Sequence, residues 1–384
     1  MSASESLIEH WCEQIRTAAQ AGQRLRPQGG GSKNFHGAPL GDAQVLNTAE
    51  LTGIVSYEPS ELVITARCGT PLQQIEAALA EKGQCLPFEP PHFGAGATVG
   101  GMVAAGLSGP ARATVGAVRD YVLGARMING KGELLSFGGQ VMKNVAGYDV
   151  SRLLAGSWGT LGVITEISLK VLPVAPGQAT LACSGLPQAA ALDLLHRWGG
   201  QPLPLNASAW LQEPGGGVSS ERLYLRLRGA AAAVESATTR MEADARALGA
   251  QLEMVEADQA QADWRASGEQ TLPFFTPPAA DHCLWRLSVP QTAPVLDLPY
   301  PSYIEWQGAQ RWLWAPASAA AALRQATQKV GGHATLFRAS PQGGDADKSV
   351  GVFTPLSAVQ LGISRELQKQ IDPAGVFQTG RLGL

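Results

Sequence analysis

The chain has 384 residues, which is too long for one compact core and predicts two domains. Hydrophobic residues make up 45% of it and its net charge is −3, so charge gives no reason to expect nucleic acid or an anionic membrane surface as a partner. No apolar run reaches the roughly 18 residues of a membrane-spanning helix, and the N-terminus lacks a signal-peptide pattern. Five scattered cysteines without CxxC spacing indicate a reducing, cytoplasmic location and argue against an iron–sulfur cluster or zinc site in this chain.

The first part of the chain predicts an α/β lobe. Residues 4–21 carry apolar side chains at helical spacing and predict an amphipathic helix. LRPQGGGS predicts a short strand that ends in a glycine loop, LVITARCGT a strand, and PLQQIEAALAEKG a helix with Pro71 near its first turn and Gly83 after its end. In VRDYVLGARMINGKGELLSFGG, two apolar strands joined by residues 129–132 predict a hairpin. GVITEISLKVLP predicts the strand that closes the lobe at Pro173.

The second part of the chain predicts an α+β domain. Residues 174–179, VAPGQA, predict the boundary. Beyond it, strands such as LYLRLRG and CLWRLSVP alternate with alanine-rich helices such as AAAVESATTRMEADARALGA, and ELQKQIDP predicts a last helix. We therefore expect an α+β protein with a first domain at 1–175 that includes the N-terminal helix, a cap domain at 176–330, and a C-terminal segment at 331–384 that packs back on the first domain.

Three glycine-rich loops in the first half of the chain point to a cofactor. They are PQGGGS at 27–32, ATVGGMVAAGLSGP at 97–110, and the glycines within residues 144–170. Glycine lets backbone N–H groups approach a polyphosphate and supplies positive φ angles. None of the loops has the GxGxxG or GxxxxGK[ST] pattern. Together they predict a dinucleotide held by several loops, whereas any one of them alone is equally explained as a tight turn.

The order of these segments resembles that of the FAD-binding domain in the vanillyl-alcohol oxidase / p-cresol methylhydroxylase (PCMH) superfamily. Within it, the chain resembles the FAD-binding E subunit of bacterial glycolate oxidases. The residues that carry the resemblance are YEP at 57–59, ELVITAR at 61–67, LPFEPPH at 86–92, VRDYVLG at 118–124, VMKNVAGYD at 141–149 and GGHAT at 331–335. The resemblance implies a two-lobed PCMH-type FAD-binding domain at 1–175 followed by the α+β cap domain.

The resemblance also implies where FAD is held. Amides of the first loop are expected to face the diphosphate from one side and those of Thr98, Gly100 and Gly101 from the other. The expected contacts are Gly29, Gly30, Gly31, Ser32, Pro87, Thr98, Gly100, Gly101, Arg119, Asp120, Gly156, Thr160, Gly162, Val163 and Ile164. A surface ion pair is the alternative for Arg119 and Asp120, and a plain core position for Val163 and Ile164. The first loop lacks the histidine found in covalent relatives, so we expect noncovalent FAD.

The catalytic residues are less distinct. Oxidation of a 2-hydroxy acid needs a cation for the carboxylate and a base for the hydroxyl proton. The candidates are His333, Arg286 and Arg311, although a structural histidine and arginines that cover apolar surface explain them as well. The six histidines are isolated, so no metal site is expected, and the HxHxGDGN motif of the larger partner subunit is absent. In the C-terminal QTGR run only the glycine and arginine match relatives, which makes Arg381 an expected contact to the FAD domain.

The resemblance implies a function as a subunit. The chain is expected to bind FAD in a glycolate dehydrogenase (oxidase) complex that oxidises glycolate to glyoxylate, with D-lactate as a further substrate, and passes electrons onward. Its implied partners are a second, catalytic FAD subunit and an iron–sulfur subunit, with no nucleic acid and no direct membrane span. The complex would place it in the cytoplasm or peripherally on the inner face of the cytoplasmic membrane. A self-sufficient FAD-dependent 2-hydroxy acid dehydrogenase and a non-catalytic FAD-binding scaffold are the alternatives.

Overall fold

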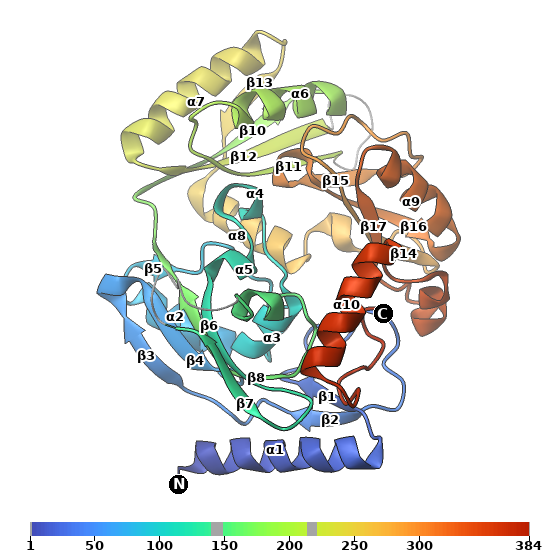
Figure 1. Ribbon diagram of the computed structural model, residues 1–384. Coiled ribbons are helices and arrows are strands. Elements are labelled where there is room, and N and C mark those ends of the chain that lie inside the picture. Colours follow the sequence, from blue (N-terminus) through green and yellow to red (C-terminus); the bar gives the residue numbers. More distant parts are fainter. Residues whose placement is uncertain (1, 140–148, 213–220, 384) are drawn as a thin grey trace. The chain divides into compact units, whose positions relative to one another are not determined.

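The computed structural model describes residues 2–139, 149–212 and 221–383 (Figure 1). Most of the predicted motif at 141–149 therefore lies outside the described residues. The chain divides into two compact units, each with its own sheet and hydrophobic core. Unit 1 comprises Met1–Leu107, Ala117–Val174 and Pro355–Leu384, and unit 2 comprises Ser108–Gly116 and Ala175–Thr354. None of the described helices is long and apolar enough to cross a membrane.

Unit 1 is built on a five-stranded antiparallel sheet in the order β3-β4-β8-β6-β7. The strands are β3 (Ile54–Glu58), β4 (Val63–Arg67), β6 (Val122–Ile128), β7 (Leu134–Gly138) and β8 (Val163–Lys170). Two smaller pairs are parallel β1 (Leu25–Gln28) with β2 (Gln44–Asn47), and antiparallel β5 (Gln84–Cys85) with β9 (Leu172–Pro173). The helices are α1 (Ala3–Ala21), α2 (Leu72–Ala80), α3 (Val99–Ala105), α5 (Val118–Tyr121) and α10 (Ala358–Ile371), with 3-10 turns at Pro59–Glu61 and Ser151–Leu154.

The sequence signals for a helix start and a hairpin turn in unit 1 agree with the structure. Helix α1 begins with a capping box, in which Ser2 and Glu5 each bind the other's backbone N–H group. The hairpin of β6 and β7 turns at Asn129, whose side-chain oxygen accepts from the N–H groups of Lys131 (2.9 Å) and Glu133 (3.0 Å). The predicted N-terminal helix and the hairpin are therefore confirmed.

Unit 2 is one antiparallel eight-stranded sheet in the order β13-β10-β12-β11-β15-β16-β14-β17. The strands are β10 (Gly177–Ser184), β11 (Leu205–Gln212), β12 (Glu221–Gly229), β13 (Gln251–Met254), β14 (His282–Ser288), β15 (Ser302–Glu305), β16 (Gln310–Pro316) and β17 (His333–Arg338). The helices are α4 (Arg112–Val115), α6 (Gln188–Gly199), α7 (Ala231–Arg246), α8 (Ala257–Glu269) and α9 (Ala320–Lys329). Its 3-10 turns are Pro273–Phe275, Trp306–Gly308, Ala317–Ala319 and Gly344–Val350.

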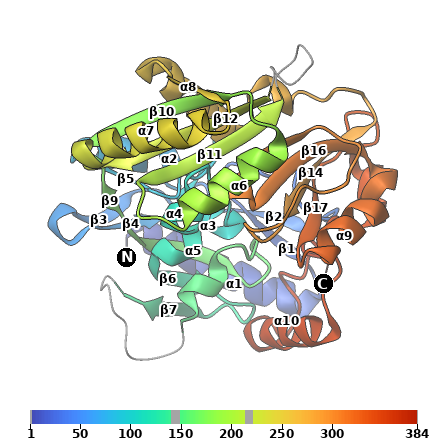
Figure 2. The ribbon, with the colours of Figure 1, turned by 90° about the horizontal axis from the view of Figure 1, so that it is seen from above.

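The two faces of this sheet differ. Helices α6 and α7 lie on one side of β10, β12 and β11, and α9 continues the cover over β14 and β17 (Figures 1 and 2). Helices α4 and α8 lie on the other side (Figure 1). There Trp264 of α8 donates to Thr180 Oγ1 at 3.0 Å, and Thr114 of α4 donates to the Leu205 carbonyl at 3.0 Å. The face toward α4 and α8 carries more polar and aromatic side chains than the face toward α6, α7 and α9.

Two segments group differently from the domain ranges expected from sequence. Strand β17 pairs with β14, so residues 331–354 belong to unit 2 and only Pro355–Leu384 returns to unit 1. Ser108–Gly116 also belongs to unit 2, because Trp306 donates to the Gly109 carbonyl at 3.0 Å and Arg112 stacks on the Trp306 ring at 4.5 Å. Both assignments depend on pairings between residues far apart in sequence, which local patterns do not reveal.

Candidate functional site

The first glycine loop, residues 29–32, follows β1 and presents four consecutive backbone N–H groups. These amides have no acceptor among the described residues, and all four residues line one cleft of unit 1. Gly30 is exposed and its three neighbours in the loop are half-buried, so a partner for these N–H groups would come from a ligand or from solvent. Successive unpaired N–H groups form a concave site suited to an anion.

The cleft is open on one side. Its empty volume of about 690 Å³ includes space that is open to solvent. The cleft is lined by residues 27–34, Thr48, Cys68, Thr98, Gly100, Gly101, Ala104, Ala105, Trp158, Gly159, Gly162, Ile164 and Arg381.

The cleft brings together predicted contacts from all three loops. These are Gly29, Gly30, Gly31, Ser32, Thr98, Gly100, Gly101, Gly162 and Ile164. The other predicted contacts, which lie elsewhere in unit 1, are Pro87, Arg119, Asp120, Gly156, Thr160 and Val163. Contact of each of these residues with a cofactor stays a prediction.

The positions of four of these six have structural explanations. Arg119 and Asp120 are exposed on α5, with 3.9 Å between their charged groups, and Asp120 accepts from the Ala117 N–H group at 2.8 Å. Val163 is fully buried in the core of the sheet. Thr160 donates to the Ser157 carbonyl at 2.7 Å. The alternatives that the sequence left open for Arg119, Asp120 and Val163 thus describe their surroundings.

Several cleft glycines serve the packing of the loops. A Cβ atom on Gly30 would overlap the carbonyl oxygen of Gly96, and one on Gly100 would lie 2.7 Å from Cys68 Cβ. The Gly100 N–H group donates to the Cys68 carbonyl at 2.8 Å, and that of Gly101 approaches Thr98 Oγ1 at 3.3 Å. The amides of Gly100 and Gly101 thus have acceptors within the protein, and contact of Thr98, Gly100 and Gly101 with the cofactor stays a prediction.

Gly101 differs from its neighbour. A Cβ atom there would meet only Thr98 Oγ1, at 3.1 Å, and otherwise open space. Because Gly101 also lines the cleft, its lack of a side chain keeps the cleft open. A side chain at Gly101 would therefore affect a ligand in the cleft more than the packing of the protein.

Unit 2 contains a second candidate site, on the sheet face opposite α9. Arg286 of β14 and His333 of β17 lie on the same face, because His333 pairs with Ser288, two residues from Arg286. Arg286 packs on the Phe337 ring at 5.6 Å and makes no hydrogen bond or ion pair with any described residue. Burial, and then the charge of Arg112, lower the pKa of Arg286 to about 10. His333 is exposed, yet desolvation by neighbouring protein and then Arg286 lower its pKa.

Arg311 is placed differently. Its guanidinium is buried and donates to the carbonyl groups of Gly308 (3.2 Å), Pro294 (2.6 Å) and Ala293 (2.7 Å). Arg311 is adjacent in β16 to Trp312, which pairs with Arg286, so its side chain leaves the sheet on the other face. Arg311 therefore holds the loop before β15 and is not brought together with Arg286 and His333.

Sequence reasoning missed a buried carboxylate on the face that carries Arg286. Glu305 is 4% exposed and accepts hydrogen bonds from Ser267 (3.0 Å), Gln310 (2.9 Å) and Trp312 (2.7 Å). Ser267 also shares a 2.9 Å hydrogen bond with Tyr303. The signal available in the sequence was an acidic residue inside an otherwise apolar strand, SYIE. These bonds fix the aromatic side chains of this face.

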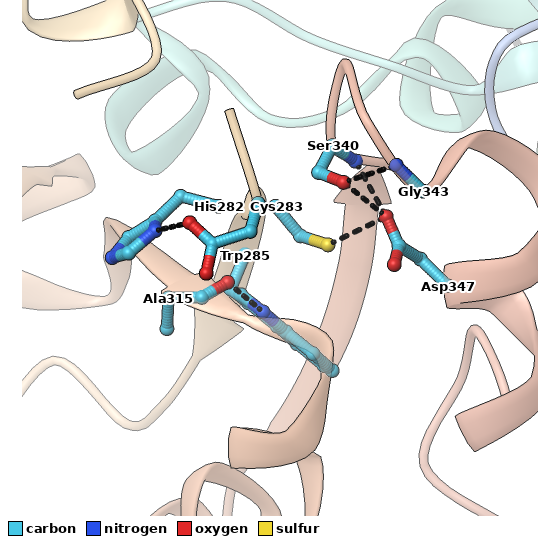
Figure 3. A network of polar contacts seen from close by, with 8 residues as sticks. His282, Cys283, Trp285, Ala315, Ser340, Gly343 and Asp347 are labelled. Atoms are coloured by element: carbon cyan, nitrogen blue, oxygen red, sulfur yellow. Dashed lines mark hydrogen bonds and ion pairs between the residues drawn. The ribbon is translucent and has the colours of Figure 1, made fainter. Parts of the chain in front are cut away.

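A third polar cluster is structural (Figure 3). The thiol of Cys283 donates to Asp347 at 3.3 Å, and the Ser340 hydroxyl donates to the same carboxylate oxygen at 2.6 Å. Burial, followed by the nearby Asp347 carboxylate, raises the pKa of Cys283 to about 12, so this thiol is protonated and a poor nucleophile. The cluster ties the 340–347 turn to β14. Within the described ranges, no three His, Cys, Asp or Glu side chains gather as metal ligands.

Comparison with known proteins agrees with this arrangement. The FAD binding domain family matches residues 8–138. Over 370 residues, which cover 96% of this chain and 95% of the other, the chain is 44% identical to glycolate oxidase subunit GlcE of Escherichia coli (strain K12). The chain belongs to the glycolate oxidase subunit GlcE family. FAD is accordingly its cofactor, and the unpaired amides of the first loop fit the diphosphate of that group.

More distant relatives match only part of the chain. It is 36% identical over 157 residues to D-lactate dehydrogenase of Archaeoglobus fulgidus and 31% identical over 156 residues to glycolate oxidase subunit GlcD of Bacillus subtilis. Each match covers 40% of this chain and about a third of the relative, 34% and 33%. A structure of alkyldihydroxyacetonephosphate synthase shares the fold, with a TM-score of 0.66 over 95% of this chain and 73% of that one, at 14% identity. The predicted PCMH-type FAD-binding fold with an α+β cap is confirmed.

Proposed function

We propose that this chain is the FAD-binding subunit of a glycolate dehydrogenase (oxidase) complex that oxidises glycolate to glyoxylate, with D-lactate as a further substrate. The observation that carries the proposal is the cleft of unit 1, where the amides of residues 29–32 lack an acceptor among the described residues, in a chain of the GlcE family. When bound, FAD supplies the two-electron acceptor for such an oxidation. FAD is held without a covalent bond.

The chain's own residues have separate tasks in this proposal. The amides of residues 29–32 bind the diphosphate, and Gly101 leaves room for it. Trp158 and Ile164 present apolar surface to the cleft and exclude water from it. Arg286, which has no anionic partner among the described residues, binds the substrate carboxylate, and His333, kept neutral by its lowered pKa, accepts the hydroxyl proton.

We also propose the partners of this subunit, a second FAD subunit that carries the main catalytic site and an iron–sulfur subunit that receives the electrons. The five cysteines of this chain are scattered and form no disulfide bond, so an iron–sulfur relay would lie on another chain. The free thiols also support a reducing compartment, and we place the complex in the cytoplasm, with attachment to the inner membrane face through its other subunits.

The test is to purify the chain alone and the assembled complex, and to compare glycolate oxidation per flavin with an artificial electron acceptor. We expect the isolated chain to retain FAD and to be much slower than the complex. Anaerobic bleaching of its flavin by glycolate measures its own contribution. A chain that binds no FAD refutes the proposal, and a chain without partners that reaches the full rate of the complex shows that it is a self-sufficient dehydrogenase.

The self-sufficient dehydrogenase remains a second candidate because Arg286 makes no hydrogen bond or ion pair with any described residue and lies on the same sheet face as His333. Arg286→Gln and the buried Arg311→Gln make a matched pair for it. If this chain oxidises glycolate itself, Arg286→Gln should raise KM for glycolate strongly, while the folded fraction of Arg311→Gln keeps the KM of the wild type. If bound flavin is not reduced by glycolate in either the isolated chain or the complex, the non-catalytic scaffold is the better description.

A further inference from the structure

The C-terminal segment brings Arg381 to the wall of the glycine-loop cleft. The segment is fixed by the buried Asp372 carboxylate, which accepts from the N–H groups of Val376 (2.9 Å) and Phe377 (2.7 Å). Arg381 itself is fixed where the Ala38 N–H group donates to its carbonyl oxygen at 2.9 Å. The position of this arginine is therefore set by the fold and not by a flexible tail.

The guanidinium of Arg381 is only partly used by the protein. One terminal nitrogen, Nη2, donates to the Lys33 carbonyl at 2.8 Å, and the group stacks on the Trp158 ring at 4.6 Å. Arg381 is 6% exposed, and its buried Nε has no acceptor among the described residues. Burial and the nearby Arg26 lower the pKa of Arg381 to about 10, which still leaves it charged at neutral pH. A buried charged donor without an acceptor is unfavourable unless a ligand provides one.

The surroundings of Arg381 show which ligand would complete it. The unpaired amides of residues 29–32 line the same cleft. The other cation there, Lys33, already donates to the His92 carbonyl (3.0 Å) and the Ser32 hydroxyl (3.3 Å). Among the described residues that line the cleft there is no aspartate or glutamate. Neutral amides with one underused guanidinium, and no carboxylate opposite, are suited to a diphosphate.

We propose that Arg381 binds the diphosphate of FAD together with the amides of residues 29–32, and so couples cofactor binding to the docking of the C-terminal segment. The inference rests on the proposed FAD-binding function and adds a residue more than 340 positions away from the first loop. The amides provide directed donors without net charge, whereas Arg381 provides the charge that offsets the two phosphates. A flavin without phosphates would gain nothing from Arg381.

The test uses the full-length chain, stripped of flavin, as wild type, Arg381→Gln, Arg381→Lys and the control Arg24→Gln. Arg24 is an exposed arginine in a recess next to Arg381 and does not line the cleft. FAD, ADP and riboflavin are titrated against each protein. A charged hydrogen bond contributes about 1.5–3 kcal/mol, and each 1.4 kcal/mol is about tenfold in Kd. We therefore expect Arg381→Gln to weaken FAD and ADP binding by about ten- to one-hundredfold, with riboflavin binding unchanged and Arg24→Gln equal to wild type.

Circular dichroism and thermal unfolding establish which variants are folded. A folded Arg381→Gln protein with the wild-type Kd for FAD and ADP overturns the proposal. Where that variant does not fold, Arg381→Lys decides: a lower FAD affinity with unchanged riboflavin affinity supports the proposal, and an equal fall in both overturns it. The outcome for the proposed function is separate, because that is decided by FAD binding and glycolate oxidation of the wild-type protein.

Discussion

Gly100 and Gly101 are neighbours in α3 with opposite surroundings, and alanine at each should have opposite effects. Alanine at Gly100 places a Cβ atom 2.7 Å from Cys68 Cβ and 3.0 Å from the Cys68 carbonyl oxygen. Overpacking of this kind costs about 1–3 kcal/mol. A unit of this size loses roughly 2–4 °C in Tm for each kcal/mol, so Gly100→Ala should unfold several degrees below wild type.

Alanine at Gly101 should leave the fold intact and weaken the binding of the cofactor. Its Cβ atom meets only Thr98 Oγ1, and replacing glycine by alanine inside a helix stabilises it by about 0.5–1 kcal/mol. The flavin-free Gly101→Ala protein should therefore unfold at or slightly above the wild-type Tm. With FAD in the cleft, the same methyl group overpacks the ligand, and about 1–3 kcal/mol of overpacking corresponds to a roughly 5- to 150-fold higher Kd.

The assay measures two quantities for each protein, the Tm of the flavin-free chain and the Kd of FAD from flavin fluorescence. The control is Gly362→Ala in α10, where a Cβ atom meets nothing within 4 Å and no cleft residue is touched. It should gain a little stability and bind FAD as wild type does. A folded Gly101→Ala protein with wild-type FAD affinity would show that the cofactor does not approach α3.

Three further predictions concern other groups. Precipitation with acid should release the yellow chromophore into the supernatant, and fluorescence retained by the denatured chain would show a covalent flavin. By NMR, the pKa of His333 should lie below 6.5, so that its contribution to stability is present above pH 6.5 and lost as the pH falls. Arg286→Gln should raise this pKa, and an unchanged pKa would show that Arg286 does not act on His333. The raised thiol pKa values of Cys68 and Cys283, about 12 for each, should make both unreactive toward iodoacetamide at pH 8 in the folded protein, with the less buried Cys85 labelled first by mass spectrometry.

Features that depend on residues close together in the sequence were predicted, and features that depend on residues far apart were not. The N-terminal helix and the turn at residues 129–132 depend on neighbours within a few positions, and both were predicted. The fate of β17 depends on its pairing with β14, about fifty residues earlier, and the sequence gives no local sign of it. The same holds for Ser108–Gly116, whose contacts in unit 2 begin about ninety residues later, at Leu205.

Within the site, sequence reasoning identified residue types but not directions. Arg286 and Arg311 both lie in strands among aromatic residues, yet Arg286 packs on the Phe337 ring without a hydrogen bond to any described residue, whereas Arg311 donates to three carbonyl groups. A one-residue change of register exchanges the two faces of a strand, so only the observed pairing distinguishes them. The same limit applies to the glycines, since Gly100 and Gly101 are identical in sequence terms but only Gly101 faces open space.

The cofactor cleft draws on both ends of the chain, and this has a consequence for how the protein is assembled. Strand β1 receives the C-terminal segment where the Leu25 N–H group donates to the Val376 carbonyl at 2.8 Å, and the first loop lies between β1 and the Arg381 contact at Lys33. All of unit 2 except Ser108–Gly116 is inserted between Val174 and Pro355, so unit 1 is complete only after unit 2 has been synthesised. The amides of residues 29–32 precede unit 2 in the chain, whereas Arg381 lies in the last thirty residues. FAD capture is therefore expected to be a late event, one that marks a chain whose two ends have met.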